Sequence, residues 1–308
     1  RLEDSAFFTR RLRTHIVILR SILCIISREG YRFVKQYTHF LATDFDGTLY
    51  HRETGIDPED IETLSHLEGK GVLRCIATGR SHFSLLRALP ADFPVDYLIV
   101  STGACIIDFR SGELLWSTAL GREETGDLSQ RFMTLGFDFM VHFPIPNNHR
   151  FFYHRNGKPN ADFERRISLY EEFAAPLSGP YDGEATQFLI VEPTNHGIHA
   201  EISSLLSQYT VVRTTSPLDH ESEWIEVFPR TVSKAQCAER LMNRVGIKRG
   251  KGNVLALGND YNDEDLLRWA ETSFIAPGAP PELGGRYPTL PGSPMGFLSR
   301  AVRSWLGN

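Results

Sequence analysis

The residues with the clearest chemical potential are two aspartates, Asp44 and Asp46, in the segment 44–48 (DFDGT). They directly follow residues 39–43, a short and mostly apolar stretch that predicts a buried strand. In an extended segment their side chains lean to the same side, and two buried like charges are stable together only if a cation lies between them. Magnesium suits this position because it takes oxygen ligands and is commonly held by one or two carboxylates. We therefore expect Asp44 to stay ionised and attack phosphorus, with Asp46 as general acid and base.

Two further apolar stretches end in hydroxyl groups and glycines. Residues 72–77 are followed by Thr78 and Gly79, and a second stretch by Thr102 and Gly103. A hydroxyl and free backbone N–H groups at the turn from a strand into a helix form a cradle for phosphate. The sequence therefore predicts that Thr78 and Gly79 bind a phosphate group.

A fourth apolar stretch, residues 253–257, leads into an acidic cluster that contains Asn259, Asp260 and Asp263. Ligands of parallel α/β sheets bind beyond the carboxyl ends of the strands. We expect the four strand ends to gather at one edge of a sheet, where their oxygen atoms suit a metal ion and a phosphate.

The elements that would position these residues alternate between strands and helices. The alternation runs from residue 38 to 120 and resumes from 224 to 308, which predicts an α/β core with a Rossmann-like, mostly parallel sheet covered on both faces. Residues 121–223 interrupt it with a region richer in aromatic residues and turns. We interpret this region as an inserted α/β domain, and we assign the strand 225–228 to the core.

Residues 1–37 precede the alternating pattern and form an N-terminal extension. The apolar run 15–27 contains Arg20, lacks a small-residue cleavage site, and is shorter than the roughly 20 residues of a membrane-spanning helix. The pattern favours an amphipathic helix that packs on the protein or on a membrane surface. No later segment is long and apolar enough to predict an integral membrane segment.

Composition excludes some classes of function. The net charge of −5 and the pI near 6.1 argue against a general nucleic-acid-binding protein, which usually carries a basic excess. The cysteines form no closely spaced pairs, which predicts reduced thiols and a cytoplasmic protein. They are Cys24, Cys75, Cys105 and Cys237. No pattern in the sequence indicates an oligomeric state.

Together these motifs resemble those of the haloacid dehalogenase (HAD) superfamily. The first motif, DxDGT, is matched by residues 44–48, and the second by Thr78. The third, a lysine at the start of a helix, is matched by Lys234, and the fourth by the acidic cluster 258–263. The insertion 121–223 lies where the subgroup of Cof-like and sucrose-phosphatase-like hydrolases has a large α/β cap domain.

The resemblance implies a phosphatase that uses Mg²⁺ and acts on a small phosphorylated metabolite, such as a sugar phosphate, through an aspartyl-phosphate on Asp44. It implies that Thr78 and Lys234 bind the phosphate group. It also implies that Asp44, the backbone carbonyl of Asp46 and the fourth motif hold the metal ion. Substrate specificity would then lie in the cap.

Two residues depart from the pattern of the subgroup. Asn259 stands where the fourth motif usually has its first aspartate, which leaves Asn259 and the next residue, Asp260, as alternative metal ligands beside Asp263. Thr102 stands where an asparagine is common before Gly103, so this candidate substrate loop is expected to make a different contact.

Other functions remain open at this point. A phosphomutase would use the same intermediate on Asp44, and a catalytically silent phosphometabolite-binding protein would agree with Asn259. The sequence argues against a serine hydrolase and a Walker-type nucleotide-binding enzyme, because neither signature occurs. Several cap residues are candidates for substrate contacts, although an aromatic core with solvated charges is the favoured explanation for them. They are Phe143, His149, Arg150, Tyr153, His154 and Lys158.

Overall fold

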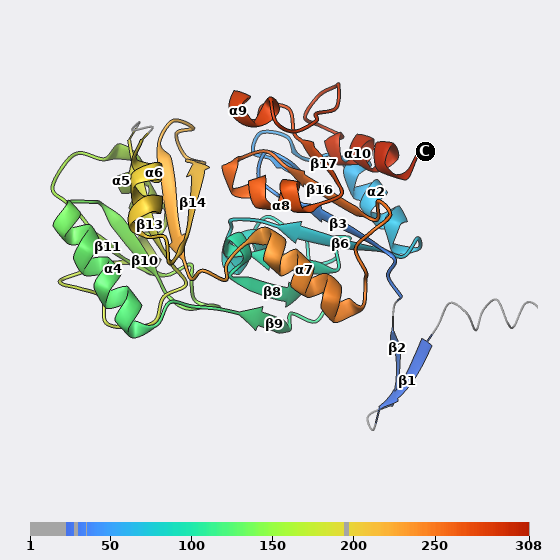
Figure 1. The fold of residues 1–308 in the computed structure, drawn as a ribbon, viewed down its shortest axis with the longest axis horizontal. Helices are drawn as coiled ribbons and strands as arrows, with labels where there is room; N and C mark the ends of the chain where they lie inside the picture. Colours follow the sequence, from blue (N-terminus) through green and yellow to red (C-terminus); the bar gives the residue numbers. More distant parts are fainter. Residues whose placement is uncertain (1–22, 28–29, 35, 194–196, 308) are drawn as a thin grey trace, which may run out of the picture.

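The structure, a computed structural model, describes residues 23–27, 30–34, 36–193 and 197–307. Two sheets lie side by side along the long axis of the molecule, each with helices packed against it (Figure 1). A sequence of strands alternating with helices predicts this mixed α/β architecture, and the structure confirms it.

The larger sheet has seven strands and contains the predicted parallel core. Its strands, in spatial order, are β17 (Thr272–Ile275), β16 (Val254–Gly258), β3 (His39–Thr43), β6 (Val72–Ala77), β7 (Tyr97–Val100), β8 (Cys105–Asp108) and β9 (Leu114–Ser117). The pairs from β17 to β7 are parallel, whereas β8 pairs antiparallel with both β7 and β9. Every residue of β6 and β16 is buried, as expected for strands covered on both faces.

Helices cover both faces of this sheet. One buried cluster contains side chains of α2 (Pro58–Glu68), α3 (His82–Leu86) and α10 (Phe297–Leu306), and another contains those of α7 (Lys234–Val245) and α8 (Glu264–Trp269). The start of α2 illustrates the local signals: the Asp57 carboxylate accepts a hydrogen bond from the Glu59 N–H at 2.8 Å, and Pro58 follows in the first turn.

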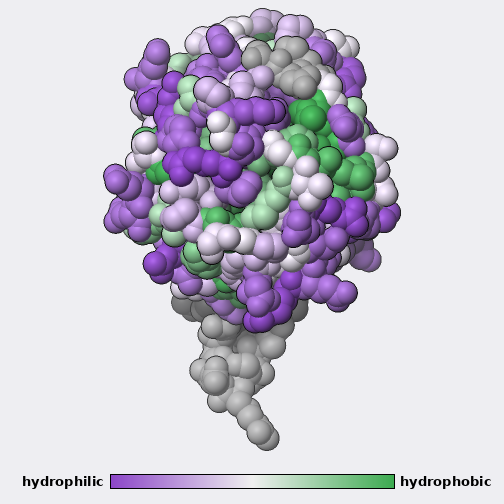
Figure 2. Space-filling view, turned by 90° about the vertical axis from the view of Figure 1, so that its left-hand side faces the viewer, coloured by the Kyte–Doolittle hydropathy of each residue, from purple (hydrophilic) through white to green (hydrophobic). Residues whose placement is uncertain are grey.

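The smaller sheet has six strands. In spatial order they are β12 (Ala174–Pro176), β11 (Phe151–His154), β10 (Phe139–His142), β13 (Gln187–Glu192), β15 (Glu223–Phe228) and β14 (Thr210–Thr215). All pairs are antiparallel except β11 with β12. Helices α4 (Arg122–Leu135) and α6 (Ile198–Leu205) pack on one face, and α5 (Ala161–Leu169) on the other. Figure 2 shows that the outer surface of this unit is largely hydrophilic, with apolar side chains between the polar ones.

The strand at residues 225–228 belongs to this smaller sheet and not to the core. β15 pairs with β13 and β14 along its whole length, so the assignment of the core from residue 224 onward is wrong. The chain returns to the larger sheet only after Phe228. An apolar strand carries no mark of which sheet it joins, because both sheets bury such strands.

The predicted helix at residues 15–27 is wrong in the part that the structure describes. Residues Leu23–Ser27 form strand β1, which pairs antiparallel with β2 (Gly30–Val34). Ile25 and Ile26 are β-branched and favour a strand. Residues 1–22 of the extension lie outside the described residues.

Several short elements were not predicted. They are the hairpin of β4 (Tyr50–His51) and β5 (Gly55–Ile56), the helix α9 (Pro281–Gly284), and the 3₁₀ turns η1 (Ser101–Gly103), η2 (Glu171–Phe173) and η3 (Tyr261–Asp263). Among the described residues, no helix combines the length and the apolar character needed to cross a bilayer.

Candidate active site

The strand ends that carry the predicted site residues lie next to one another, because β16, β3, β6 and β7 are consecutive in the larger sheet. Asp44 directly follows β3, and its N–H donates to the Leu257 carbonyl of β16 at 2.8 Å. The Thr102 N–H donates to the Thr78 carbonyl at 3.0 Å, which joins the ends of β7 and β6. The structure therefore brings the four predicted segments to the carboxyl edge of one sheet.

Lys234 forms the centre of this site. Its side chain is fully buried, and its Nζ donates to Asp44 Oδ1 at 2.9 Å and to Asp263 Oδ1 at 2.6 Å. Both carboxylates are also buried. A buried ammonium group needs such partners, because an unpaired buried charge is strongly destabilising. The structure thus joins the predicted first, third and fourth motifs in one ionic network.

The start of α7 fixes the position of Lys234. The Ser233 hydroxyl caps the helix by accepting from the Gln236 N–H at 3.1 Å, and it also donates to the carboxylate of Asp265. Gly103 lies against this turn: a Cβ at Gly103 would come within 2.5 Å of the Ser233 carbonyl oxygen. Gly103, with a φ of 101°, is therefore required for the close approach of the predicted substrate loop to Lys234.

Burial and neighbouring charges shift the pKa values of this network. Burial raises the pKa of Asp44 to about 8, with Asp263 and Asp46 acting in the same direction and Lys234 opposing them. Burial alone would lower the pKa of Lys234, but Asp263 and Asp44 outweigh that effect and raise it. Lys234 is therefore held in its charged form, while burial disfavours the ionised form of Asp44.

The side chain of Asp46 is paired with Arg80, a partner that was not predicted from the sequence. Its carboxylate forms a bidentate ion pair with Arg80, with Oδ1···Nη2 at 2.6 Å and Oδ2···Nε at 2.7 Å. The Arg80 guanidinium also lies over the rings of Phe45 and Tyr50. The side chain of Asp46 is 44% exposed, which leaves it accessible to a substrate.

A set of oxygen atoms around Asn259 fits a magnesium ion. The inner end of the Asn259 amide lies 3.2 Å from Asp44 Oδ2 and 2.9 Å from the Asp46 carbonyl oxygen. Adjacent ligands of an octahedral magnesium ion are about 3 Å apart, since the metal–oxygen distance is about 2.1 Å. The described residues contain no cluster of three or more His, Cys, Asp or Glu side chains that could hold a metal ion, so this site depends on amide and backbone oxygens as well.

Two of the predicted metal ligands make other contacts. The Asp260 carboxylate turns to the smaller sheet, where it accepts from the Thr214 hydroxyl at 2.9 Å and the Thr215 N–H at 2.8 Å. Asp260 therefore does not replace Asn259 at the site. Asp263 binds Lys234 through Oδ1, while its Oδ2 accepts from the Asn259 N–H at 2.9 Å. In this structure Asp263 positions Lys234 and the backbone of Asn259.

Thr78 and Gly79 form the predicted turn after β6. The Thr78 side chain is buried and its Oγ1 accepts from the Arg80 N–H at 3.1 Å. A Cβ at Gly79 would lie 3.4 Å from Asn262 Nδ2 and 3.6 Å from Thr102 Oγ1, so Gly79 lies between two other segments of the site. The turn is thus placed at the site, with a hydroxyl and backbone groups of the kind that bind phosphate.

Thr102 connects the site to the smaller sheet. Its hydroxyl donates to Glu226 on β15 at 3.0 Å, and Gln187 on β13 donates to the same carboxylate at 2.7 Å. Burial raises the pKa of Glu226, and these two hydrogen bonds oppose the shift. A second link joins Asn148 to the Ser101 hydroxyl at 2.7 Å. The predicted substrate loop therefore lies under polar groups of the inserted region.

The sequence analysis missed Arg80, Glu226 and Gln187. Arg80 directly follows Thr78 and Gly79, so its place in the segment was a usable signal. Glu226 is a charged residue in the predicted strand 225–228, whose other three residues are apolar, and this is also a signal for a polar partner. Among the six cap residues considered from the sequence, His149 contacts the core, where its ring stacks on Phe83 at 4.1 Å.

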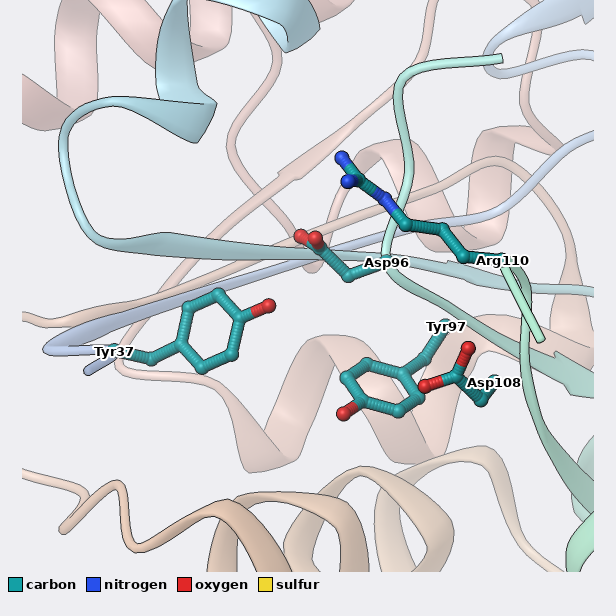
Figure 3. Close-up of a pocket in the computed structure, with 5 residues that line it drawn as sticks. All are labelled: Tyr37, Asp96, Tyr97, Asp108 and Arg110. Atoms are coloured by element: carbon teal, nitrogen blue, oxygen red, sulfur yellow. The ribbon is translucent and has the colours of Figure 1, made fainter. Parts of the chain in front are cut away.

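A separate surface pocket lies at the opposite end of the strands. Its lining residues come from the segment before β3, the start of β7 and the end of β8, and are Tyr37, Asp96, Tyr97, Asp108 and Arg110 (Figure 3). Asp96 pairs with the buried guanidinium of Arg74 there. None of the predicted site residues lines this pocket, so it is distinct from the candidate active site.

Known proteins share both the sequence pattern and the fold. The pattern of the haloacid dehalogenase-like hydrolase family matches residues 41–284. An HMP-PP phosphatase from Serratia proteamaculans is 24% identical over 259 residues, covering 81% of this chain and 87% of that protein. A chloroplastic endoribonuclease YBEY from Arabidopsis thaliana is 22% identical over 79% of this chain, but only 42% of that protein is matched.

Solved structures agree with the fold. A phosphatase of the HAD superfamily from Bacteroides thetaiotaomicron is 20% identical, with a TM-score of 0.68 over 91% of this chain and 98% of that chain. A HAD subclass IIB sugar phosphatase has a TM-score of 0.65 at 19% identity, over 88% of this chain and 99% of that chain. Because the family pattern covers most of the sequence and the site residues fall within it, this chain belongs to the haloacid dehalogenase-like hydrolases, as an enzyme of the phosphatase type.

Proposed function

We propose that this enzyme is a magnesium-dependent phosphatase that hydrolyses a small phosphorylated metabolite, with sugar phosphates as the first candidate class. The supporting observation is the buried network in which Lys234 pairs with both Asp44 and Asp263. Asp46 forms a separate ion pair with Arg80. This arrangement separates a buried nucleophile from an accessible acid and base.

The proposed reaction has two steps. In the first, which starts from the protonated form of Asp46, a carboxylate oxygen of Asp44 attacks phosphorus, the bond from phosphorus to the leaving oxygen breaks, and Asp46 gives that oxygen its proton and becomes a carboxylate. In the second, Asp46 takes a proton from water, whose oxygen attacks phosphorus and breaks the bond to Asp44. Inorganic phosphate leaves, and both aspartates return to their initial states.

In this proposal Lys234, Thr78 and Gly79 bind the phosphoryl oxygens. Asp44, the backbone carbonyl of Asp46 and the Asn259 side chain would hold the magnesium ion, and their spacing supports this assignment. When bound, the ion offsets negative charge on the transferring phosphoryl group. Its positive charge also favours the ionised form of Asp44, whose pKa is otherwise raised by burial.

The leaving group would lie between Thr102–Gly103 and the inserted region, which we propose to be a cap domain spanning residues 121–228. Glu226, Gln187 and Asn148 support a leaving group with several hydroxyls, because carboxylate and amide groups both bond to hydroxyls. The similarity to a sugar phosphatase agrees with this class.

We also propose a cytoplasmic location. The described cysteines outside β1 are buried free thiols, which fits a reducing compartment, and are Cys75, Cys105 and Cys237. The small phosphorylated substrate would be the main partner of the enzyme.

The test is phosphate release from a panel of sugar phosphates, nucleotides and cofactor phosphates, with added Mg²⁺ and with EDTA. We expect release from at least one sugar phosphate, and loss of that release in EDTA that is restored by Mg²⁺. Release that is insensitive to EDTA would contradict the metal assignment. Transfer of phosphate to another hydroxyl of the substrate would identify a phosphomutase, and no turnover of any compound would contradict the phosphatase proposal.

The ion pair of Arg80 with Asp46 leads to a further prediction. Arg80→Ala should lower kcat by about 10- to 100-fold, because the acid and base is no longer held in one orientation. KM should change less, since Asp46 acts on the leaving oxygen and not on phosphate binding. Arg87→Ala, which changes an exposed arginine at the end of α3, is the matched control. Equal kcat values for the two variants would refute a positioning role for Arg80.

A further inference from the structure

The Asn259 side chain occupies a closed position at the candidate metal site. The inner end of its amide lies 3.2 Å from Asp44 Oδ2, 2.9 Å from the Asp46 carbonyl oxygen and 3.2 Å from Thr48 Oγ1. Gly47 forms the adjacent wall, and a Cβ there would come within 2.5 Å of Asn259 Nδ2. The amide therefore has little freedom other than rotation between its two orientations.

The two orientations of the Asn259 amide differ in whether they need a cation nearby. With the NH₂ group inward, the amide donates to Asp44 Oδ2 and to the Asp46 carbonyl, so that two buried acceptors are satisfied without any ion. With Oδ1 inward, only the Thr48 hydroxyl can donate to it. The amide oxygen then faces two other acceptors at 3.2 and 2.9 Å with no proton between them, an arrangement that a cation would stabilise.

We propose that the Asn259 amide is an internal substitute for the metal ion: its NH₂ group takes the place of magnesium in the metal-free enzyme, and the amide turns over to present Oδ1 when the ion binds. This inference rests on the proposed magnesium dependence and adds a property of this chain, since the fourth motif of the subgroup that the sequence resembles usually has an aspartate at this position. Binding the ion breaks the two hydrogen bonds of the NH₂ group. The amide also brings no negative charge, so the enzyme binds magnesium weakly. When the ion leaves, the NH₂ group again donates to Asp44 Oδ2 and to the Asp46 carbonyl oxygen.

An aspartate at position 259 would have the opposite effects on metal-free stability and on metal affinity. Without metal, a third carboxylate would join Asp44 and Asp263 around the single Lys234, and the NH₂ donor would be absent. With metal, the additional charge would strengthen binding, because affinity for hard cations follows the charge of the ligands. The substitution should therefore lower metal-free stability and raise metal affinity together.

The experiment compares the wild type with Asn259→Asp by thermal unfolding in EDTA and by titration with Mg²⁺ in a calorimeter. We expect Asn259→Asp to unfold about 2–4 °C lower, or more, in EDTA, and to bind Mg²⁺ at least about 10-fold more tightly. Asn243→Asp, an exposed change on α7, should alter neither quantity. Asn259→Ala should lower metal-free stability without tightening Mg²⁺ binding, because it removes the donor and adds no charge.

The side-chain NH₂ signals of Asn259 in a ¹⁵N NMR spectrum give a direct view of the amide. They are assigned by their loss in Asn259→Asp, and we expect them to move on Mg²⁺ saturation while those of Asn243 stay in place. Unchanged metal-free stability in Asn259→Asp, with equal Mg²⁺ affinity, would overturn the inference and leave the phosphatase proposal standing. Failure of both proteins to bind Mg²⁺ would overturn the proposed metal dependence as well.

Discussion

Replacing Asp44 with Asn is expected to reduce phosphate release by on the order of 10⁴-fold or more, because the amide cannot form the acyl-phosphate bond that the proposed reaction needs. The asparagine side chain has nearly the shape of the aspartate side chain. Its amide oxygen would remain within reach of Lys234 Nζ, which lies 2.9 Å from Asp44 Oδ1. Kinetics with the best substrate of the panel, together with thermal unfolding, check the result.

Asp44→Asn also distinguishes a loss of catalysis from a loss of folding. Asp108→Asn, at the end of β8 and outside the site, is the matched control and should keep full activity. A folded Asp44→Asn protein that retains more than about one tenth of the activity would assign the nucleophile elsewhere. Trapping the phosphorylated wild-type enzyme with labelled substrate and locating the label on Asp44 would support the covalent step independently.

Replacing Lys234 with Met is expected to destabilise the protein by about 3–5 kcal/mol and to abolish activity. The ammonium group is the shared partner of Asp44 and Asp263, so its removal leaves two buried carboxylates facing each other. Methionine keeps most of the volume of the side chain, so that the loss of charge dominates the effect. Urea unfolding at neutral pH measures the change.

Controls for this prediction follow from the network. Lys248→Met, at an exposed position, should change the free energy of unfolding little. Adding Asp44→Asn to Lys234→Met should recover part of the lost stability, because it removes one of the two unpaired charges. Additive destabilisation in the double variant would show that the carboxylates do not share Lys234 as the structure indicates.

The sequence was sufficient to predict most of the core and the strand ends of the site, because strands β3, β6, β7 and β16 have a strong apolar pattern and are followed by an unusual polar motif. Asp44, Thr78 and Asp263 are recognisable from such local signals, whereas Lys234, at the start of a helix, was assigned through the family resemblance. The structure places all four at one edge. The orientation of Asp46 and Asp260 was not predictable. Their carboxylates are directed by Arg80 and by Thr214, which are distant in sequence and meet them only in the folded chain.

The position of β15 shows a similar limit. Residues 225–228 are as apolar as a core strand, and only the pairing with β13 and β14 decides that they belong to the smaller sheet. The apolar segment 15–27 has a pattern that predicts a helix, but its described part, Leu23–Ser27, forms a hairpin with Gly30–Val34. A short apolar segment can form either a helix or a strand, and the pairing with a second strand decides between them.

The path of the chain from β15 into α7 has a mechanical consequence. Glu226 on β15 binds the Thr102 hydroxyl, and the same chain presents Lys234 to Asp44 eight residues later, with Gly103 pressed against Ser233 in between. The smaller sheet is thus connected by only eight residues of backbone to the ammonium group that pairs with Asp44. If the cap binds the leaving group as proposed, a displacement of β15 is expected to reach Lys234, and through it Asp44, along this short connection.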